Sequence, residues 1–278
     1  MQTFIIYIPI MQLSIAYNSD PDLITALARF PEVREIYGKT DKDVIGGGRS
    51  TYLLRTSSKR DISHAVNLAH KHGLEFNYLL NGASLGGVEQ TRQGQKKIRS
   101  LLGFLSDIKV DNITVASPYL LRLIKAQFPC FKVRVSVFAS VDSAVKAKAW
   151  QEFGADKICI SAIACNRDFK RLAAIRKAVS CELQLIANAS CLLSCPYELT
   201  HMDMLTRSSS STDTLKGFCL DYCFLHCSSK RLRDPVNFIR STWIRPEDLV
   251  FYENLGYSDF KIVERGCSTR LLLRRVEA

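Results

Sequence analysis

The chain repeats one pattern along most of its length, a short β-prone run followed by a stretch with helical spacing. Eight such runs can be counted. They are Leu13–Tyr17, Val33–Tyr37, Phe76–Leu80, Asn112–Ala116, Val133–Phe138, Lys157–Ile160, Glu182–Ala187 and Phe260–Val263. Strands that alternate with helices predict parallel β/α packing, and eight units favour a closed (β/α)8 TIM-type barrel over an open sheet.

The expected helices follow these strands, with one long interruption. They are Pro21–Arg29, Arg60–His72, Glu89–Ser106, Tyr119–Gln127, Val141–Phe153, Asp168–Val179 and a last helix from Thr269 onward. The interruption is the segment 188–259, between the seventh and eighth strands. A connection of this length in a compact domain is usually functional. It leaves from the C-terminal ends of the strands, where barrel enzymes place their active sites.

These boundaries predict a single barrel domain over residues 11–278, which includes the insertion 188–259. Residues 1–10 are expected to be an N-terminal extension, with Met11 as an alternative start just before the first strand. The last helix stops abruptly at Ala278, which leaves room for a longer natural chain. The apolar run Phe4–Met11 is too short to cross a bilayer and has no basic residue before it, so no membrane segment is expected.

The net charge of +11 favours an anionic partner, either a small molecule or RNA. The basic residues are spread over several helices without an aromatic-rich RNA-binding motif, so a solvated basic surface is the alternative. Ten cysteines in a chain of 278 residues do not resemble the disulfide set of a small secreted protein. We therefore expect a reducing, cytoplasmic location, where grouped cysteines favour metal binding over disulfides.

Two cysteine pairs lie in the insertion, Cys191 with Cys195 and Cys223 with Cys227. Four thiolates that converge can hold a tetrahedral metal ion or an iron–sulfur cluster. Zinc pairs more often have two intervening residues than the three found here, although two to four occur. A radical S-adenosylmethionine motif would need a third cysteine at the position of Glu198. The spacing therefore leaves an iron–sulfur cluster, zinc and purely structural thiols as alternatives.

Other residues of the chain offer thiols or imidazoles as well. Cys219, His201 and His226 lie close enough in sequence to replace one of the four ligands. The remaining cysteines are expected to serve in packing. Cys130, Cys159 and Cys181 are predicted to be small core residues, and simple packing is also expected for Cys165 and Cys267.

Polar residues at strand ends are the catalytic candidates, because these ends line the active site of a barrel. The candidates are Arg49, Asn81, Asn188 and Glu264. Arg49 follows the glycines of the loop at 46–48, and a guanidinium there could clamp a carboxylate or phosphate at two points. No Ser/His/Asp order and no His-Glu-x-x-His motif is present, so conventional protease machinery is not visible in the sequence.

Several longer motifs carry a family resemblance. They are MQLSIAYNSDPDL from Met11, IGGGR, FNYLLNG at Phe76–Gly82, NRDFKRLAAIRKAV at Asn166–Val179, NASCLLSCPYE at Asn188–Glu198, the YC-x-x-x-C block and WIRPEDL at Trp243–Leu249. The chain resembles the collagenase-like U-32 peptidase family over nearly its whole length from Met11. The cysteine blocks and WIRPEDL are the most specific part of the resemblance.

The resemblance implies a β/α barrel with clustered cysteines. Relatives bind a 4Fe–4S cluster through four cysteines and take part in oxygen-independent hydroxylation of ubiquinone precursors or RNA bases, with prephenate as oxygen donor. By this resemblance Cys191, Cys195, Cys223 and Cys227 are the cluster ligands, with zinc as the alternative metal. Three functions are thus expected alternatives: a cluster-dependent modifying enzyme, a peptidase, and a non-catalytic subunit of a hetero- or homo-oligomer.

Overall fold

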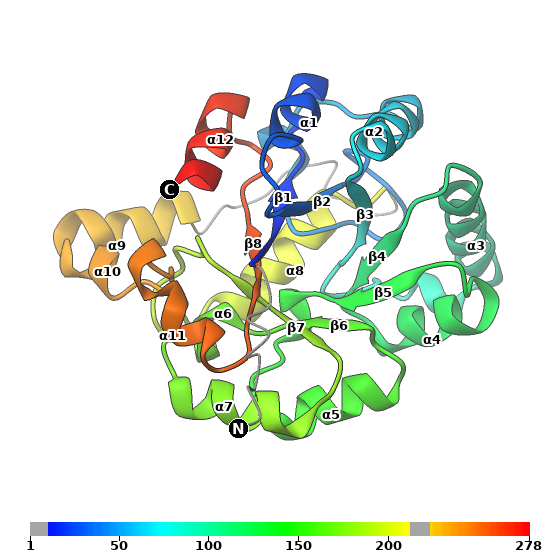
Figure 1. Ribbon diagram of the computed structural model, residues 1–278. Coiled ribbons are helices and arrows are strands. Elements are labelled where there is room, and N and C mark those ends of the chain that lie inside the picture. Colours follow the sequence, from blue (N-terminus) through cyan, green and yellow to red (C-terminus); the bar gives the residue numbers. More distant parts are fainter. Residues whose placement is uncertain (1–10, 212–222) are drawn as a thin grey trace, which may run out of the picture.

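The computed structural model describes residues 11–211 and 223–278, and of Cys223 and Phe224 only the backbone. Eight parallel strands follow one another in chain order and close into a barrel, because β8 pairs with β1 (Figure 1). The strands are β1 (Gln12–Ala16), β2 (Val33–Gly38), β3 (Glu75–Leu80), β4 (Asn112–Val115), β5 (Lys132–Val135), β6 (Lys157–Cys159), β7 (Glu182–Ile186) and β8 (Asp259–Ile262). The predicted (β/α)8 TIM-type fold is confirmed.

A ring of helices surrounds the barrel (Figure 1). They are α1 (Pro21–Leu27), α2 (Lys59–Lys71), α3 (Arg92–Asp107), α4 (Pro118–Gln127), α5 (Ala144–Glu152), the short α6 (Ala162–Cys165), α7 (Phe169–Ala178) and α12 (Thr269–Glu277). In the described ranges, no helix has the length and apolar character needed to cross a bilayer. The short α6 was not predicted from the sequence, because four residues are too few to show helical periodicity.

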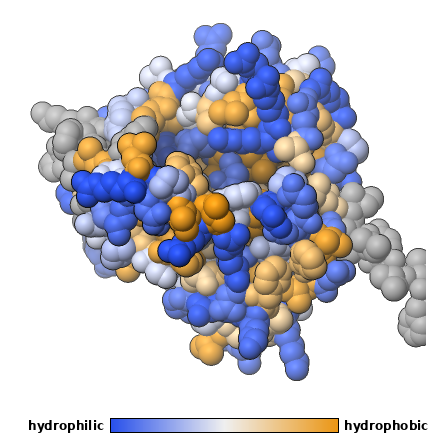
Figure 2. Space-filling view, turned by 90° about the vertical axis from the view of Figure 1, so that its left-hand side faces the viewer, coloured by the Kyte–Doolittle hydropathy of each residue, from blue (hydrophilic) through white to orange (hydrophobic). Residues whose placement is uncertain are grey.

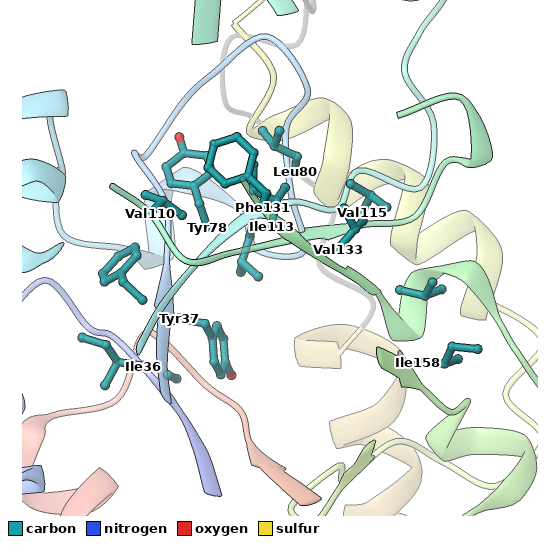
Figure 3. Close-up of a cluster of buried hydrophobic side chains, with 14 of the residues drawn as sticks. Ile36, Tyr37, Tyr78, Leu80, Val110, Ile113, Val115, Phe131, Val133 and Ile158 are labelled. Carbon is teal, nitrogen blue, oxygen red and sulfur yellow. The ribbon is translucent and has the colours of Figure 1, made fainter. Parts of the chain in front are cut away.

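Successive residues of each strand face opposite sides, and the two sides differ sharply in polarity. Figure 3 shows Ile36 and Tyr37 on opposite sides of β2. The outer side packs on the helices and forms the main hydrophobic core, with fully buried residues such as Ile36, Ile113 and Ile158. The inner side carries polar residues, whereas barrel interiors usually hold branched apolar ones. Hydrogen bonds and ion pairs therefore hold the interior of this barrel together.

Two networks fill the N-terminal half of the interior. In the first, the Glu35 carboxylate pairs with the Arg134 guanidinium at 2.7 Å and accepts hydrogen bonds from the amides of Asn77 and Asn112 at 3.2 and 3.1 Å. In the second, Lys157 forms an ion pair with Asp259, which also accepts from the Gln184 amide. These contacts link strands that are distant in sequence and satisfy the charges that the barrel encloses.

Local capping explains where the predicted boundaries were wrong. The fifth strand was expected to reach Phe138 but ends at Val135, because the Ser136 hydroxyl accepts from the Phe138 amide and starts a 3-10 turn. The helix expected from Glu89 begins at Arg92, after a 3-10 turn (Val88–Gln90) and a Thr91 cap. Side-chain caps of this kind are worth about 1 kcal/mol, enough to decide a boundary.

The expectation for one cysteine also needs correction. Cys130 was predicted to be a core residue but is exposed, whereas Cys159 and Cys165 are buried and Cys181 is half-buried. Cys130 lies between α4 and β5, in a turn at the surface. The apolar neighbours that suggested burial, Phe128 and Phe131, pack inward while the thiol points to the side of Ser106, 3.6 Å away.

The insertion between β7 and β8 is folded rather than an open loop. It contains α8 (Glu198–Ser208), a π-helical turn (Cys223–Cys227), α9 (Ser228–Arg233), α10 (Val236–Ile239) and α11 (Leu249–Glu253). The last turn of α8 bonds to the loops after β2 and β3: the Ser209 hydroxyl accepts from the Gly47 amide at 2.9 Å, and the Thr206 hydroxyl accepts from the Ala83 amide at 2.9 Å. Since α8 follows β7 in the chain and ends against the loops after β2 and β3, it lies over the C-terminal end of the barrel.

Two glycines of α3 provide a matched stability test. A Cβ at Gly94 would lie 2.0 Å from the Val88 carbonyl oxygen, whereas a Cβ at Gly103 meets nothing within 4 Å. We expect Gly94→Ala to lower the free energy of unfolding by about 1–3 kcal/mol through overpacking. Gly103→Ala should raise it by up to about 1 kcal/mol through helix propensity. Urea unfolding of both variants measures the difference, and a stabilised Gly94→Ala would contradict the geometry.

Candidate functional site

Charged side chains gather in the C-terminal half of the barrel interior, around the ring of Tyr37 on β2. The ammonium nitrogen of Lys261, on β8, lies 3.8 Å from the centroid of this ring. The Tyr37 hydroxyl donates to the Ile262 carbonyl at 2.9 Å, so the ring is held in place. Burial raises the pKa of the Tyr37 hydroxyl far above its ordinary value, which keeps it neutral. A neutral aromatic face is a favourable neighbour for a cation.

Arg265 joins this group from the loop after β8. It is 8% exposed, and burial followed by the repulsion of Arg49 lowers its pKa to about 10. Burial also lowers the pKa of Lys261, and Arg265 contributes to that shift. In the described part of the chain, neither side chain makes a hydrogen bond or an ion pair with a carboxylate. The two cations are thus enclosed without a directly paired carboxylate among the described residues, which is costly in a protein interior.

Two of the predicted catalytic candidates meet at the rim of this group. The Arg49 guanidinium pairs with the Glu264 carboxylate at 3.0 Å, and both side chains are part-exposed. Glu264 has φ 104°, in the left-handed region that non-glycine residues seldom adopt. Backbone outliers of this kind cluster at functional sites. The predicted placement of Arg49 at the mouth of the barrel agrees with this geometry.

The glycine loop is fixed by the carboxylate of Asp43. This group accepts from the amides of Ile45 and Gly46 at 2.9 Å each and from the Tyr78 hydroxyl at 3.0 Å. Its ion pair with the buried Lys39 ammonium is 3.0 Å long. Gly46 has φ 76°, and a Cβ there would lie 2.3 Å from the Thr206 carbonyl of α8. Asp43 and α8 therefore fix the conformation of the loop.

The other two candidates lie apart from this group. Asn81 packs against the glycine loop, where its amide donates to the Ser136 hydroxyl at 3.3 Å and its carbonyl oxygen is buried without a partner in the described part. Asn188 pairs with the backbone of Val263, donating at 3.0 Å and accepting at 2.7 Å. Asn188 thus extends the β7–β8 pairing. The structure brings Arg49 and Glu264 together and places Asn81 and Asn188 elsewhere.

The cysteine-bearing loop after β7 lies against the same half of the barrel. Ala189 and Ile186 pack with Cys159 and Ala162 in a small apolar cluster of the upper interior. Burial raises the pKa of the Cys159 thiol to about 11, and the cation of Lys261 opposes this rise. Cys159 is near Lys261, and Ala189 packs in the same cluster as Cys159. The loop segment 189–191 therefore begins next to the Lys261 group.

Three of the four paired cysteines influence one another. Burial raises the pKa of the Cys191 thiol to about 11, and the nearby Cys227 and Cys195 raise it further. Cys191 itself is an exposed residue. Cys195 is half-buried and Cys227 is buried. In the ranges 11–211 and 223–278, no group of three metal-ligating side chains is close enough to hold an ion.

Contacts beside the cysteines explain how the two pairs come together. The rings of Tyr197 and His226 are 4.6 Å apart, which joins the segment after Cys195 to the turn that ends at Cys227. The Arg231 guanidinium donates to the Ser190 carbonyl, next to Cys191. Cys223 belongs to the same helical turn as Cys227, but its side chain is outside the described part, and Cys219 lies wholly outside it. Neither Cys219 nor the two histidines can be assigned as ligands from these contacts.

The sequence of this barrel matches a known protein family. Residues 38–252 match the family model described as Peptidase family U32. That range covers more than half of the 278 residues. The chain belongs to peptidase family U32. The resemblance seen in its motifs is therefore confirmed at the level of the family.

Two relatives extend the comparison. An uncharacterised protease of Methanocaldococcus jannaschii is 32% identical over 224 residues, which are 81% of this chain and 65% of that relative. The chain thus spans less than two thirds of the relative's length. The solved structure of the U32 peptidase Mk0906 is 22% identical, with a TM-score of 0.69 over 92% of this chain and 93% of that one. At this identity the similarity shows the shared fold alone.

A cavity of about 820 Å³ opens at the other, N-terminal end of the barrel of this U32 protein. Its central charged residues already pair with one another: Lys157 lies 2.8 Å from Glu182, and Arg134 lies 2.7 Å from Glu35. In barrels this end contributes to stability, and chemistry takes place at the other end. We therefore interpret this cavity as the solvated end of the two internal networks.

The insertion also exposes apolar side chains. Figure 2 views the side of the molecule that carries α9 to α11 and shows apolar residues among hydrophilic ones. Leu232 is 81% exposed and Ile239 68%, with Phe238 and Phe251 both at 56%. Large apolar side chains that are exposed together are typical of interaction surfaces. The predicted hetero- or homo-oligomeric partner stays a prediction.

Sequence reasoning missed the central residues of this site, Lys261, Tyr37 and Cys159. A signal for Lys261 was present, because a charged residue in the run FKIV interrupts an apolar strand. Tyr37 and Cys159 carry no such signal, since both residue types are common in apolar strands. Arg265 was not among the candidates, although it directly follows Glu264 in the sequence.

Proposed function

We propose that this U32 protein is a modifying enzyme that binds an anionic substrate at Lys261 and Arg265, beside an iron–sulfur cluster held by Cys191, Cys195, Cys223 and Cys227. The observation that supports this most directly is the pair of enclosed cations without a carboxylate partner among the described residues. They lie at the C-terminal end of the barrel, where barrel enzymes act.

An anionic ligand would remove the main energetic defect of this site. An enclosed cation costs several kcal/mol unless an opposite charge or hydrogen bonds compensate it. A carboxylate between Lys261 and Arg265 would supply both, and Arg49 at the rim could add a further contact by releasing Glu264. Because Lys261 is enclosed within the barrel, a small molecule fits this position better than the backbone of an RNA.

The cysteines support a metallocluster in the loop above. Cys191 lies near Cys227 and Cys195, and Cys223 precedes Cys227 by one helical turn. Four thiolates with soft sulfur donors suit a 4Fe–4S cluster, which would supply one-electron chemistry at this end of the barrel. The protein's part is to shield the thiols and to hold the substrate below them. Oxygen-independent hydroxylation, which the family resemblance implies, is a reaction of this kind.

The family name favours a second candidate, peptide hydrolysis, because the M. jannaschii relative is described as a protease. A peptidase needs an activated nucleophile or a metal-bound water. The raised pKa of the Cys159 thiol keeps it protonated, so it is a poor nucleophile as it stands. Peptide cleavage by metal-free protein, lost on a single change at Lys261 or Arg265, would favour this candidate.

Metal content tests the proposal. Anaerobic reconstitution with iron and sulfide should give a brown protein with about four irons per chain and a cluster signal in electron paramagnetic resonance. Cys191→Ser and Cys227→Ser should each lose most of this iron. Cys130→Ser is the matched control. This variant should retain its iron, because Cys130 is exposed in the turn between α4 and β5. Circular dichroism confirms that the variants fold, and a colourless protein with a single zinc ion would contradict the cluster.

A further inference from the structure

Lys261 differs from the other enclosed lysines of the barrel in its surroundings. Lys39 is paired with Asp43 at 3.0 Å and donates to the Gly46 carbonyl, and Lys157 is paired with Asp259 and Glu182. These two ammonium groups are held by acceptors. Lys261 is 9% exposed and lies over the face of Tyr37, with no hydrogen-bond acceptor for its ammonium group among the described residues.

Burial, more than the charges around it, favours the neutral amine of Lys261. Burial lowers its pKa, and Arg134 and Arg265 act in the same direction, whereas Cys159 and Glu35 oppose the shift. Glu35 is already paired with Arg134 at 2.7 Å, and the Cys159 thiol stays protonated because its own pKa is about 11. A lysine that is desolvated and close to another cation is the usual setting for an amine that attacks carbonyl carbon.

We propose that Lys261 is a nucleophile that forms an imine with the carbonyl carbon of a substrate whose carboxylate is bound by Arg265. This inference rests on the anion site of the proposed function and deepens it. The class of substrate follows from the two groups together: an amine requires a carbonyl, and the enclosed guanidinium of Arg265 requires an anion, so a 2-oxo acid satisfies both.

The step balances without any further reagent. The neutral Nζ adds to the carbonyl carbon, a C–N bond forms, and the two amine protons leave with the carbonyl oxygen as water. The product is an imine, and its protonated form would be stabilised by the face of Tyr37, which already lies 3.8 Å from Nζ. The Tyr37 hydroxyl is committed to the Ile262 carbonyl, so the ring contributes through its face and not as a proton donor.

Reductive trapping tests this inference. The full-length protein is incubated with pyruvate and cyanoborohydride, digested and analysed by mass spectrometry. We expect one reduced adduct on the peptide that contains Lys261. Lys261→Arg keeps the positive charge but lacks a nucleophilic amine, so it should lose the adduct while remaining folded. Lactate, which has the carboxylate but no carbonyl, should give no adduct.

Binding without reductant separates this inference from the proposed function. Calorimetry should show that lactate and pyruvate both bind, and that Arg265→Gln weakens both by about tenfold or more, since a charge-assisted pair is worth about 1.5–3 kcal/mol. If both acids bind and no adduct forms at Lys261, the imine is wrong and the anion site stands. Adducts spread over exposed lysines, and retained equally in Lys261→Arg, would also overturn the imine. If neither acid binds, the anion site itself is wrong.

Discussion

Glu35→Gln should lower the free energy of unfolding by about 3–5 kcal/mol, because it removes one partner of an enclosed ion pair. Glu35 is 2% exposed, and its carboxylate lies 2.7 Å from the Arg134 guanidinium. The same carboxylate accepts from the amides of Asn77 and Asn112. A glutamine has the same shape but no charge, and its amide group would face these donors. Equilibrium urea unfolding measures the loss.

Glu75 provides the matched control for this prediction. It also contacts Arg134, at 3.3 Å, but its side chain is 41% exposed. Exposed pairs contribute about 0–1 kcal/mol, so Glu75→Gln should cost far less than Glu35→Gln. Equal losses for the two variants would mean that burial of the Glu35–Arg134 pair does not determine its contribution.

Asp43→Asn should destabilise the protein by a similar amount, about 3–5 kcal/mol, and should also loosen the glycine loop. The Asp43 carboxylate accepts from two backbone amides of the loop and from Tyr78, and it pairs with the enclosed Lys39. An asparagine presents one oxygen instead of two and leaves Lys39 without a counterion. Urea unfolding measures the stability, and limited proteolysis should detect new cleavage between residues 43 and 48.

Asp41→Asn is the control for the loop. Asp41 is two residues away and half-exposed, and within the described residues its side chain makes no hydrogen bond to the loop. Surface substitutions of this kind change stability by about 0.5 kcal/mol or less. If Asp43→Asn leaves both the unfolding curve and the proteolysis pattern unchanged, the loop is held by its contacts with α8 instead.

Much of the fold could be predicted because the signals that determine it are local. Each strand shows as a short apolar run, and each helix as a longer stretch after it, so eight units could be counted without tertiary information. The errors arose where one hydroxyl decides a boundary, as Ser136 does for the fifth strand and Thr91 for α3. Such caps shifted each boundary by three residues, which the periodicity of the sequence cannot resolve.

The candidate site was predicted only in part. Arg49 and Glu264 were expected at the barrel mouth from their places after strands, and they form an ion pair there. Asn188 was selected by the same rule, but its side chain pairs with the backbone of Val263. Position after a strand determines which end of the barrel a residue occupies. Whether its side chain faces the centre depends on contacts with elements far away in the chain.

The sequence by itself determined the barrel, the family and the grouping of cysteines within one insertion, because periodicity, motifs and spacing are properties of neighbouring residues. Only the tertiary structure decided that Lys261 and Arg265 are enclosed without a counterion, whereas Lys39 and Lys157 have one. The physical reason is that the cost of a charge depends on everything around it. Tyr37 comes from β2, Cys159 from β6 and Lys261 from β8, and only closure of the barrel brings them together.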